Sequence, residues 1–375
     1  MKTVHHPLLE GAPGARLELL SLHFGTPGTG PKVAIQACLH ADEIPAMLVA
    51  HHLRQQLQAL EAAGRLTGEV VLVPAANPIG LQQRLLQSPQ GRFEFGSGEN
   101  FNRHYADLTE GALARLGGAA AALGEDVTQN VARVRQALRE AAAALPAATT
   151  LASLRKTLLG LAIDADIVLD LHCDNDAVMH LYTATPVWPR VEPLARLLGA
   201  RTVLLAEESG DHPFDEACSM VWPQLAARLG GPERLPPSCV AVTVELRGET
   251  DVDHGLAEAD ARALIDYLAT QGVVSGPAPV LPPALCEATP LAGCMPVTAP
   301  HAGVLAWRQA PGGRVAAGEL LGDLIEPMSG LVTELRSPVD GVFFARELRR
   351  FTLAGASVAK VAGATALRSG KLLSE

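Results

Sequence analysis

Short, continuous runs of apolar residues recur along the first 270 or so residues, separated by segments with the spacing of amphipathic helices. A run without polar alternation is typical of a strand that is covered on both faces. Strands of this kind that alternate with helices predict an α/β fold, with a mixed, largely parallel central sheet flanked by helices. The runs predicted to be strands are residues 33–39, 70–75, 167–171, 179–183, 202–206 and 240–246.

Two of the predicted helices have recognisable ends. The first covers about residues 45–62, because it starts with a proline, which suits a first turn, and Gly64 suits the position beyond the end. It joins the first two predicted strands, so the unit is a right-handed crossover between parallel strands. The second covers about residues 255–269, with Asp253 as its N-terminal cap and Gly272 beyond its end.

Three later changes in residue composition suggest how the chain is divided into structural units. Residues 108–162 are rich in Ala, Leu and Arg, and we interpret them as an inserted helical hairpin with a packing or oligomer role. Residues 273–285 contain four prolines, which indicates a linker or an edge crossing between domains. Short strands and glycine turns follow. We therefore expect a domain over residues 1–275 and a small C-terminal β-barrel or β-sandwich over residues 286–375.

A candidate metal site lies where predicted strands end. His40 and Glu43 form the one His-x-x-Glu of the chain, directly after the first predicted strand, and His172 ends a later one. Ligands in open α/β sheets gather at the carboxyl ends of strands. Two histidines and one carboxylate, with a position left for water, make the ligand set of a hydrolytic zinc site. The alternative for His172 is a core histidine that is hydrogen-bonded to Asp170 or Asp174.

Three further motifs follow one another along the chain. Asn-Pro-Ile-Gly stands at 77–80, Asn-Phe-Asn-Arg at 100–103, and Glu245 near the end of a late strand. Together with the His-x-x-Glu and His172, this set over about residues 30–270 resembles the succinylglutamate desuccinylase/aspartoacylase family of zinc deacylases, relatives of the zinc carboxypeptidases. The resemblance implies one Zn²⁺ per chain, bound by His40, Glu43 and His172.

The same resemblance implies roles for other residues. Asn102 and Arg103 would bind a substrate carboxylate, and Glu245 would be the general base. An upstream arginine would polarise the scissile carbonyl; we choose Arg84, with Arg92 as the alternative. The chain departs from the family in Phe101, where leucine is usual, and in its long segment 108–162.

Each of these residues also has an ordinary explanation. Glu245 could be an unremarkable strand-end carboxylate, with Glu249 or Asp251 as the acid instead, and arginines usually lie on the surface. The loop at 209–216 lies near the expected cleft, and we expect Asp211 and His212 in it to contact substrate.

Composition narrows the class of function. The net charge is −10 and no Lys/Arg cluster occurs, so neither nucleic acid nor an anionic membrane is an expected partner. No apolar run is long enough to span a membrane, and the first residues lack the apolar core of a signal peptide. The six cysteines are scattered, which favours reduced thiols and a cytoplasmic location.

The C-terminal part carries a second resemblance. Pro-His-Ala-Gly-Val at 300–304 and Ser-Pro-Val-Asp-Gly-Val at 337–342 resemble a biotinyl/lipoyl-type barrel. A carrier domain of that type needs a lysine at its hairpin tip, and the corresponding residues 326–330 contain none. We therefore expect a non-carrier barrel that shapes the cleft or contributes to a homo-oligomer.

Three functions remain open from the sequence. The leading hypothesis is a zinc-dependent amidohydrolase that removes an acyl group from a small N-acyl amino acid. The second is a metallocarboxypeptidase that uses the same site on peptides. The third is a non-catalytic binding protein on the same fold, which the joint presence of His40, Glu43, His172 and Glu245 disfavours.

Overall fold

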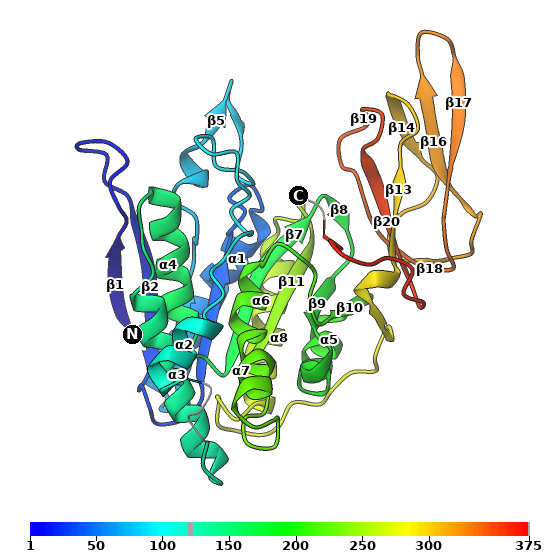
Figure 1. Cartoon of the computed structure of the whole chain (residues 1–375). Coiled ribbons are helices and arrows are strands. Elements are labelled where there is room, and N and C mark those ends of the chain that lie inside the picture. The colour runs from blue at the N-terminus through cyan, green and yellow to red at the C-terminus, as the bar shows by residue number, and fades with distance from the viewer. Residues whose placement is uncertain (119–122, 374–375) are drawn as a thin grey trace.

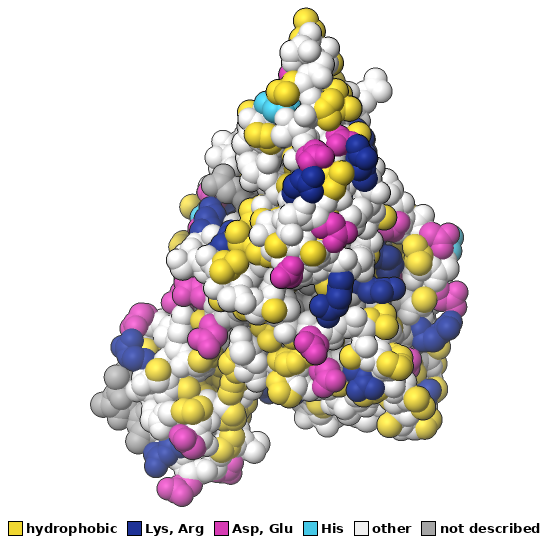
Figure 2. Space-filling model, turned by 90° about the vertical axis from the view of Figure 1, so that its right-hand side faces the viewer, with side chains coloured by type: hydrophobic (Ala, Val, Ile, Leu, Met, Phe, Trp, Pro, Cys, Tyr) yellow, Lys and Arg dark blue, Asp and Glu magenta, His cyan; other side chains and the backbone are white. Residues whose placement is uncertain are grey.

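The structure is a computed structural model that describes residues 1–118 and 123–373. A large sheet with helices on both faces forms the body of the molecule, and a group of β-strands from the C-terminal part stands beside it (Figure 1). Among the described residues, no helix combines the length and the apolar character needed to span a membrane. On the face seen in Figure 2, acidic and basic side chains are interspersed rather than gathered by sign.

The main sheet has nine strands in the order β1-β2-β4-β3-β7-β11-β9-β10-β12 among the described residues. The central run β4, β3, β7 and β11 is parallel throughout, whereas β9 pairs with β11 in the antiparallel direction. The strands are β1 (Lys2–Pro7), β2 (Glu18–Gly25), β3 (Lys32–Ala37), β4 (Glu69–Val73), β7 (Ile167–Asp174), β9 (His180–Ala184), β10 (Thr202–Ala206), β11 (Val240–Gly248) and β12 (Ala288–Pro290).

Two helical layers cover this sheet. Alternate residues of the central strands point to opposite faces, so Val33 and Ile35 pack with one layer and Ala34 with the other. One layer consists of α1 (Pro45–Ala62), α5 (Trp188–Leu198) and α8 (His254–Thr270). The other consists of α2 (Thr109–Leu116), α3 (Val127–Ala143), α4 (Thr150–Ala162), α6 (Phe214–Ser219) and α7 (Val221–Leu229).

The predicted fold class is confirmed. The sheet is mixed and largely parallel, and the strands predicted in its interior are present to within three residues at each end. The helix predicted over 45–62 is α1. Asp253 caps α8 by accepting hydrogen bonds from the backbone of Gly255 and Leu256. The edge strands β1 and β2 were not predicted, because their sequences mix polar and apolar residues.

The segment 108–162 differs from the predicted hairpin. It holds three helices, α2, α3 and α4, within the part of the chain that the structure describes. Val134 and Leu138 of α3 and Leu154 and Leu158 of α4 are buried in the same core as the sheet residue Val168. The segment is therefore part of the layer that covers one face of the sheet, rather than an appendage.

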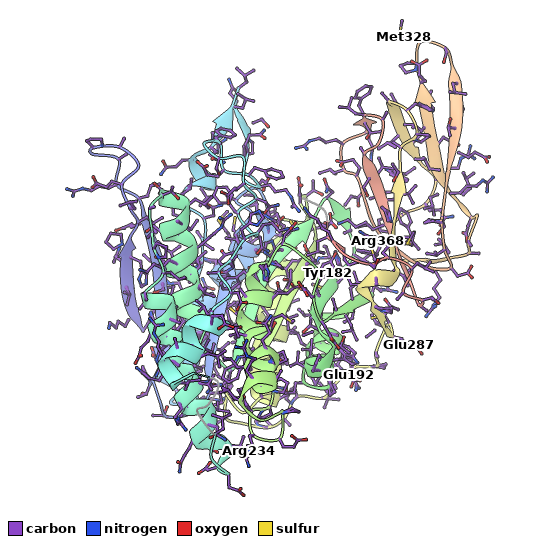
Figure 3. All side chains as sticks on the ribbon, in the orientation of Figure 1. Tyr182, Glu192, Arg234, Glu287, Met328 and Arg368 are labelled. Carbon is purple, nitrogen blue, oxygen red and sulfur yellow. The ribbon has the colours of Figure 1, made fainter. Side chains whose placement is uncertain are left out.

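The C-terminal residues form two antiparallel sheets, ordered β13-β20-β18-β15 and β17-β16-β14-β19. Their shared core is apolar and includes Leu305, Leu324 and Phe343. Met328 marks the distal tip of the β16–β17 hairpin (Figure 3). The strands are β13 (Cys294–Thr298), β14 (Gly303–Trp307), β15 (Arg314–Val315), β16 (Leu320–Glu326), β17 (Leu331–Arg336), β18 (Gly341–Arg346), β19 (Phe351–Thr352) and β20 (Ser357–Gly363).

These sheets are tied to the main domain at one edge. The short strand β8 (Asp176–Ala177) pairs with β18, and Arg346 and Arg350 both contact the carboxylate of Asp176. β12 follows the proline-rich linker and nevertheless pairs with β10 of the main sheet. The division into residues 1–275 and 286–375 and the carrier-type barrel stay predictions, whereas additional antiparallel C-terminal sheets are confirmed.

Candidate metal centre and pocket

A sharp turn after β3 positions the His-x-x-Glu. Cys38 has a positive φ of 65°, and its amide donates to the carbonyl of Leu171 on β7, so the chain leaves the sheet beside that strand. The side-chain amide of Asn77, from the Asn-Pro-Ile-Gly motif, donates to the carbonyl of Leu39. Pro45 then opens α1. The motif residue Asn77 therefore holds the turn that presents His40 and Glu43.

The three predicted metal ligands lie together. The Nδ1 atom of His40 is 2.8 Å from Oε1 of Glu43, and the Nδ1 atom of His172 is 2.7 Å from Oε2 of the same carboxylate. One ligand atom from each residue lies within 4.8 Å of the others, and all three side chains are buried. The geometry and the donor set fit a single divalent cation such as zinc.

The far nitrogen of each imidazole is also engaged. His40 Nε2 is 2.8 Å from Oδ1 of Asn100, and His172 Nε2 is 2.9 Å from Oδ2 of Asp170. Gln36 donates to the other oxygen of Asp170. A ring that donates from Nε2 presents the Nδ1 lone pair, so these contacts favour the tautomers that a metal needs.

Burial and charge set the protonation of the cluster. Burial and the Arg92 guanidinium lower the pKa of His40, which keeps its ring neutral. Burial also opposes the charged form of His172, but the carboxylates of Asp170 and Glu43 outweigh it and raise that pKa well above its ordinary value. Without a metal, His172 therefore carries a proton that a bound cation would have to displace.

Glu245 lies beside this cluster on the neighbouring strand. It is directly opposite His172 in the register of β11 and β7, so both side chains point to the same side of the sheet. Its Oε2 atom is buried and has no hydrogen-bond partner among the described residues. Burial and the carboxylate of Glu43 raise the pKa of Glu245 to about 8.

The two candidate arginines lie in different places. Arg84 is exposed on β5 (Arg84–Leu85), which pairs with β6 (Ser88–Pro89) in a projecting hairpin, and it does not line the pocket. Arg92 follows this hairpin and lines the pocket, with its Nη1 atom 3.2 Å from Oε1 of Glu43. The structure thus brings Arg92, and not Arg84, to the metal cluster.

Asn102 and Arg103 enter the pocket from a buried loop. The Asn102 side chain lies 3.3 Å from His172 Nε2 and accepts a hydrogen bond from the backbone of Phe214. The guanidinium of Arg103 donates to the carbonyl of Asn102 at 2.7 Å. Burial and the nearby Arg92 lower the pKa of Arg103, although Asp215 opposes them. Arginine side chains are rarely this buried unless they pair with a polar or charged group, so Arg103 is a candidate for binding a polar group of a ligand.

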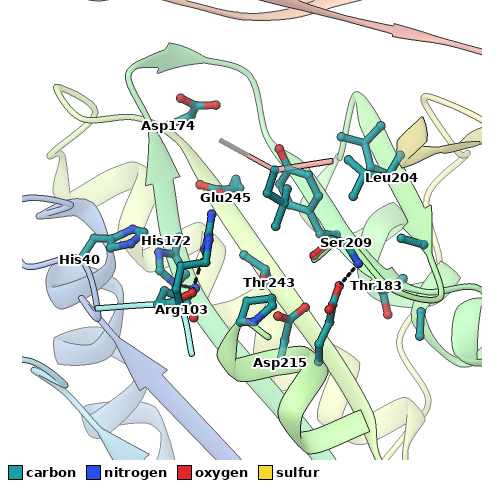
Figure 4. Close-up of a pocket in the computed structure, with 18 of the residues that line it drawn as sticks. His40, Arg103, His172, Asp174, Thr183, Leu204, Ser209, Asp215, Thr243 and Glu245 are labelled. Carbon is teal, nitrogen blue, oxygen red and sulfur yellow. Dashed lines mark hydrogen bonds between the residues drawn. The ribbon is translucent and has the colours of Figure 1, made fainter. Parts of the chain in front are cut away.

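The pocket extends away from the metal cluster as a cavity of about 90 Å³. Figure 4 shows His40 and His172 at one end and Thr183 and Leu204 at the other. Asp215 and Glu216 line the far part, whereas the predicted contacts Asp211 and His212 do not. Asp211 instead pairs with Lys371, and His212 is exposed.

The C-terminal part of the chain completes the pocket wall. Lys360 of β20 reaches Asp174, two residues beyond His172, with Nζ 2.5 Å from Oδ2. Leu373 also lines the pocket, and the amide of Leu372 donates to the carbonyl of Ser209. Sequence reasoning missed these contacts, since nothing local in residues 357–373 indicates which part of the main domain they face.

Asn100 was within reach of sequence reasoning, because it belongs to the Asn-Phe-Asn-Arg motif. It was not singled out, since its partner His40 lies far away along the chain. Asp215 and Glu216 belong to the loop at 209–216 that was expected near the cleft. Their neighbours were chosen instead, because sequence does not indicate which side chains of a loop face inward.

Comparisons with known proteins agree with this architecture. The profile of the succinylglutamate desuccinylase/aspartoacylase catalytic domain matches residues 29–270. A crystal structure of a succinylglutamate desuccinylase/aspartoacylase family protein from Shewanella amazonensis is 28% identical, with a TM-score of 0.84 over 96% of this chain and 98% of that chain. A similar protein from Shewanella frigidimarina is 24% identical, with a TM-score of 0.81 over 96% of both chains.

A more distant structure has the same fold. It is the product-bound ectoine utilization protein EutE (DoeB) from Ruegeria pomeroyi, which is 17% identical with a TM-score of 0.67 and covers 96% of this chain and 94% of that one. A search of curated protein sequences returned no match. The profile match covers well over half of the chain and contains the metal cluster, Glu245 and the Asn-Arg pair. The chain therefore belongs to the succinylglutamate desuccinylase/aspartoacylase family.

Proposed function

We propose that this protein is a zinc-dependent amidohydrolase that removes the acyl group from a small N-acyl amino acid. The observation that carries the proposal is the cluster of His40, Glu43 and His172 with Glu245 beside it on the next strand. A deacylase of this kind is what the family leads one to expect.

The donor set supports zinc. Two imidazole nitrogens and one carboxylate suit Zn²⁺ and leave a position open for solvent. Asn100 and Asp170 hold the rings in the orientation that binding requires. When bound, the ion supplies the Lewis acidity that makes water a usable nucleophile near neutral pH.

Glu245 is placed to move the proton. As a half-buried carboxylate on the metal side of the sheet, it accepts a proton from the attacking water and later returns it to the amine nitrogen that leaves. Arg92 contributes positive charge at the same end of the pocket, where negative charge develops on the carbonyl oxygen. We therefore assign Arg92, rather than Arg84, to the scissile carbonyl.

Arg103 and Asn102 hold the amino-acid carboxylate in this proposal. A planar guanidinium can make two parallel hydrogen bonds to a carboxylate, which a lysine could not copy. Lys360, Leu291 and Leu373 also line the pocket. This enclosure favours a small substrate and disfavours the alternative, a metallocarboxypeptidase that acts on long peptides.

The test is a substrate screen with the purified protein, loaded with zinc and then stripped by a chelator. We expect release of free amine from N-acetyl or N-succinyl amino acids, and loss of this activity on stripping. Release of C-terminal residues from peptides with no action on N-acyl amino acids would favour the carboxypeptidase. No hydrolysis of either class by the zinc-loaded protein would favour a binding protein. We further propose a cytoplasmic location, which the free thiols of the six cysteines support.

A further inference from the structure

A cluster of three histidines lies on the helical layer formed by α1, α5 and α8, away from the pocket. His51 and His52 are neighbours in the second turn of α1, and His254 is the first residue of α8. The two helices pack against each other. His51 and His254 are exposed and His52 is half-buried. None of the three lines the pocket, so the proposed reaction does not use them.

Two of these imidazoles meet across the pair of helices. Nε2 of His52 lies 3.1 Å from Nδ1 of His254. Zinc and similar ions bind imidazole nitrogen at about 2.0–2.1 Å, so two such ligands that meet at about 90–110° have nitrogens about 2.8–3.4 Å apart. The distance between the two nitrogens falls within this range. The pair therefore has the separation of two ligands of one ion.

The rings are arranged much like those of the candidate metal centre. The ring centroids of His52 and His254 are 5.3 Å apart with an interplanar angle of 85°, and those of His51 and His52 are 5.3 Å apart at 84°. In the metal centre, the rings of His40 and His172 are 4.9 Å apart at 70°. Because the surface rings are exposed or half-buried, small rotations suffice to direct all three toward one point.

Each of the three imidazoles has a lone pair to offer. A hydrogen bond between two neutral imidazoles uses one N–H and one lone pair, whereas a metal needs both lone pairs. Nδ1 of His52 and Nε2 of His254 have no hydrogen-bond partner in the described part of the chain, so the proton can move there. The side-chain amide of Gln55 donates to Nε2 of His51 at 3.0 Å, so that nitrogen already presents its lone pair.

The surrounding charge permits a cation at this place. His254 stands at the N-terminal end of α8, where the helix dipole disfavours positive charge. The carboxylate of Asp253 caps this end by accepting hydrogen bonds from the backbone of Gly255 and Leu256, and its negative charge offsets the dipole. The net charge of −10 favours cations as well.

We propose that His51, His52 and His254 bind one divalent transition ion of the kind that prefers imidazole, such as Ni²⁺, Cu²⁺ or Zn²⁺, and that this ion cross-links α1 to α8. α1 begins two residues after Glu43, and α8 follows β11, which carries Glu245. The ion thus joins the two helices that follow catalytic segments. Since the site lies outside the pocket, the inference does not depend on the proposed function.

This surface site should hold its ion less tightly than the metal centre. Among the described residues, no carboxylate pairs with any of the three histidines, whereas Asp170 lies behind His172. A partner of that kind raises metal affinity about 10- to 100-fold. The surface ion should therefore exchange with solvent and be lost on gel filtration, so its binding is measured at equilibrium.

The first experiment is a calorimetric titration of the zinc-loaded protein with Ni²⁺, beside the variants His254→Gln and His51→Gln. We expect about one Ni²⁺ per chain with a micromolar Kd in the unchanged protein, and a Kd at least about 10-fold higher in each variant. Mg²⁺, which prefers oxygen ligands, should not bind. Equal affinity in either variant, or no binding below about 1 mM Ni²⁺, would overturn the three-imidazole site.

His5→Gln is the matched control. His5 is also an exposed histidine, but it lies on β1 and pairs with Glu18. The variant should bind Ni²⁺ as the unchanged protein does. An equal loss of affinity in His5→Gln and His254→Gln would contradict a site at α1 and α8.

The second experiment tests the cross-link by thermal unfolding of the zinc-loaded protein. Saturating Ni²⁺ should raise the Tm of the unchanged protein by about 2–5 °C, because the ion binds only when the two helices are packed together. The Tm of His254→Gln should not change with Ni²⁺, and without Ni²⁺ it should equal that of the unchanged protein, since His254 is exposed. Binding of Ni²⁺ without a rise in Tm would contradict the cross-link.

Discussion

The two ends of the pocket are built in different ways. The metal end comes from β3, β7 and β11, which are neighbours in one parallel run, and its residues stand at the strand ends. The far end combines β10 and α6, which come from separate parts of the chain. The register between neighbouring strands determines where the side chains of the metal end lie. Packing between segments that are distant in sequence determines where those of the far end lie.

This difference in construction separates the residues that determine the reaction from those that determine the preference among substrates. Register between parallel strands leaves little freedom, so His172 and Glu245 must stand side by side wherever the sheet forms. Loops and docked segments can change without disturbing the sheet. We therefore expect variants at the metal end to change the reaction of every substrate alike, and variants at the far end to change the preference among substrates.

The largest effect should follow from Glu245→Gln. Loss of the group that moves the proton should lower kcat about 10²- to 10⁴-fold for all substrates, with zinc still bound. Glu249→Gln is the control, because Glu249 follows the same strand but does not line the pocket. Unchanged kcat in Glu245→Gln, measured with two substrates of different charge, would remove Glu245 from the reaction.

Arg92→Ala should come next, with a fall of about 10²- to 10³-fold in kcat, as expected for a group that stabilises charge on an oxyanion. Arg84→Ala should behave like the unchanged enzyme, because Arg84 is exposed on the projecting hairpin. Kinetic constants of the two variants decide between the arginines. A larger loss in Arg84→Ala would mean that the hairpin closes over the substrate.

Asp170→Asn should weaken zinc binding about 10- to 100-fold, because the carboxylate beside His172 Nε2 makes that imidazole a better ligand. Asp166→Asn is the matched control, since Asp166 lies before the other end of β7 and pairs with Arg135. Competition with a chromogenic chelator gives both affinities. Equal affinities in the two variants would show that Asp170 has only a packing role.

The smallest effect is a pH dependence of zinc binding. The pKa of His172 is raised well above its ordinary value, so the metal-free protein holds a proton there that the metal-loaded protein cannot hold. Binding releases this proton, and the affinity should therefore rise with pH, by up to about tenfold per unit between pH 6 and 8. An affinity that falls or stays level over this range would contradict the protonated His172.

Most of the main sheet could be predicted from sequence. Its central strands are continuous apolar runs, because helices cover both of their faces, and such runs stand out from their surroundings. The segment 108–162 was recognised as helical, but its three helices were not. The proline-rich linker indicated a boundary, yet β12 beyond it joins the main sheet, and no local pattern distinguishes that pairing.

Some residues of the candidate site could also be predicted from sequence, and others could not. His40, Glu43, His172 and Glu245 could be named because each stands at a strand end or in a recognisable motif. Arg92 and Arg84 could not be separated, since the hairpin between β5 and β6 decides which of them turns inward. Asp215 was overlooked because it lies on a short helix whose inward face depends on the packing of Phe214 in the core.

The central claim is that His40, Glu43 and His172 bind one metal ion, and metal analysis tests it most directly. Purified protein is saturated with Zn²⁺, freed of excess metal by gel filtration and analysed by mass spectrometry of the metal, beside the variant His40→Ala. The account predicts about one zinc per chain in the unchanged protein and almost none in the variant. Zinc at one per chain in both proteins, or in neither, would contradict it.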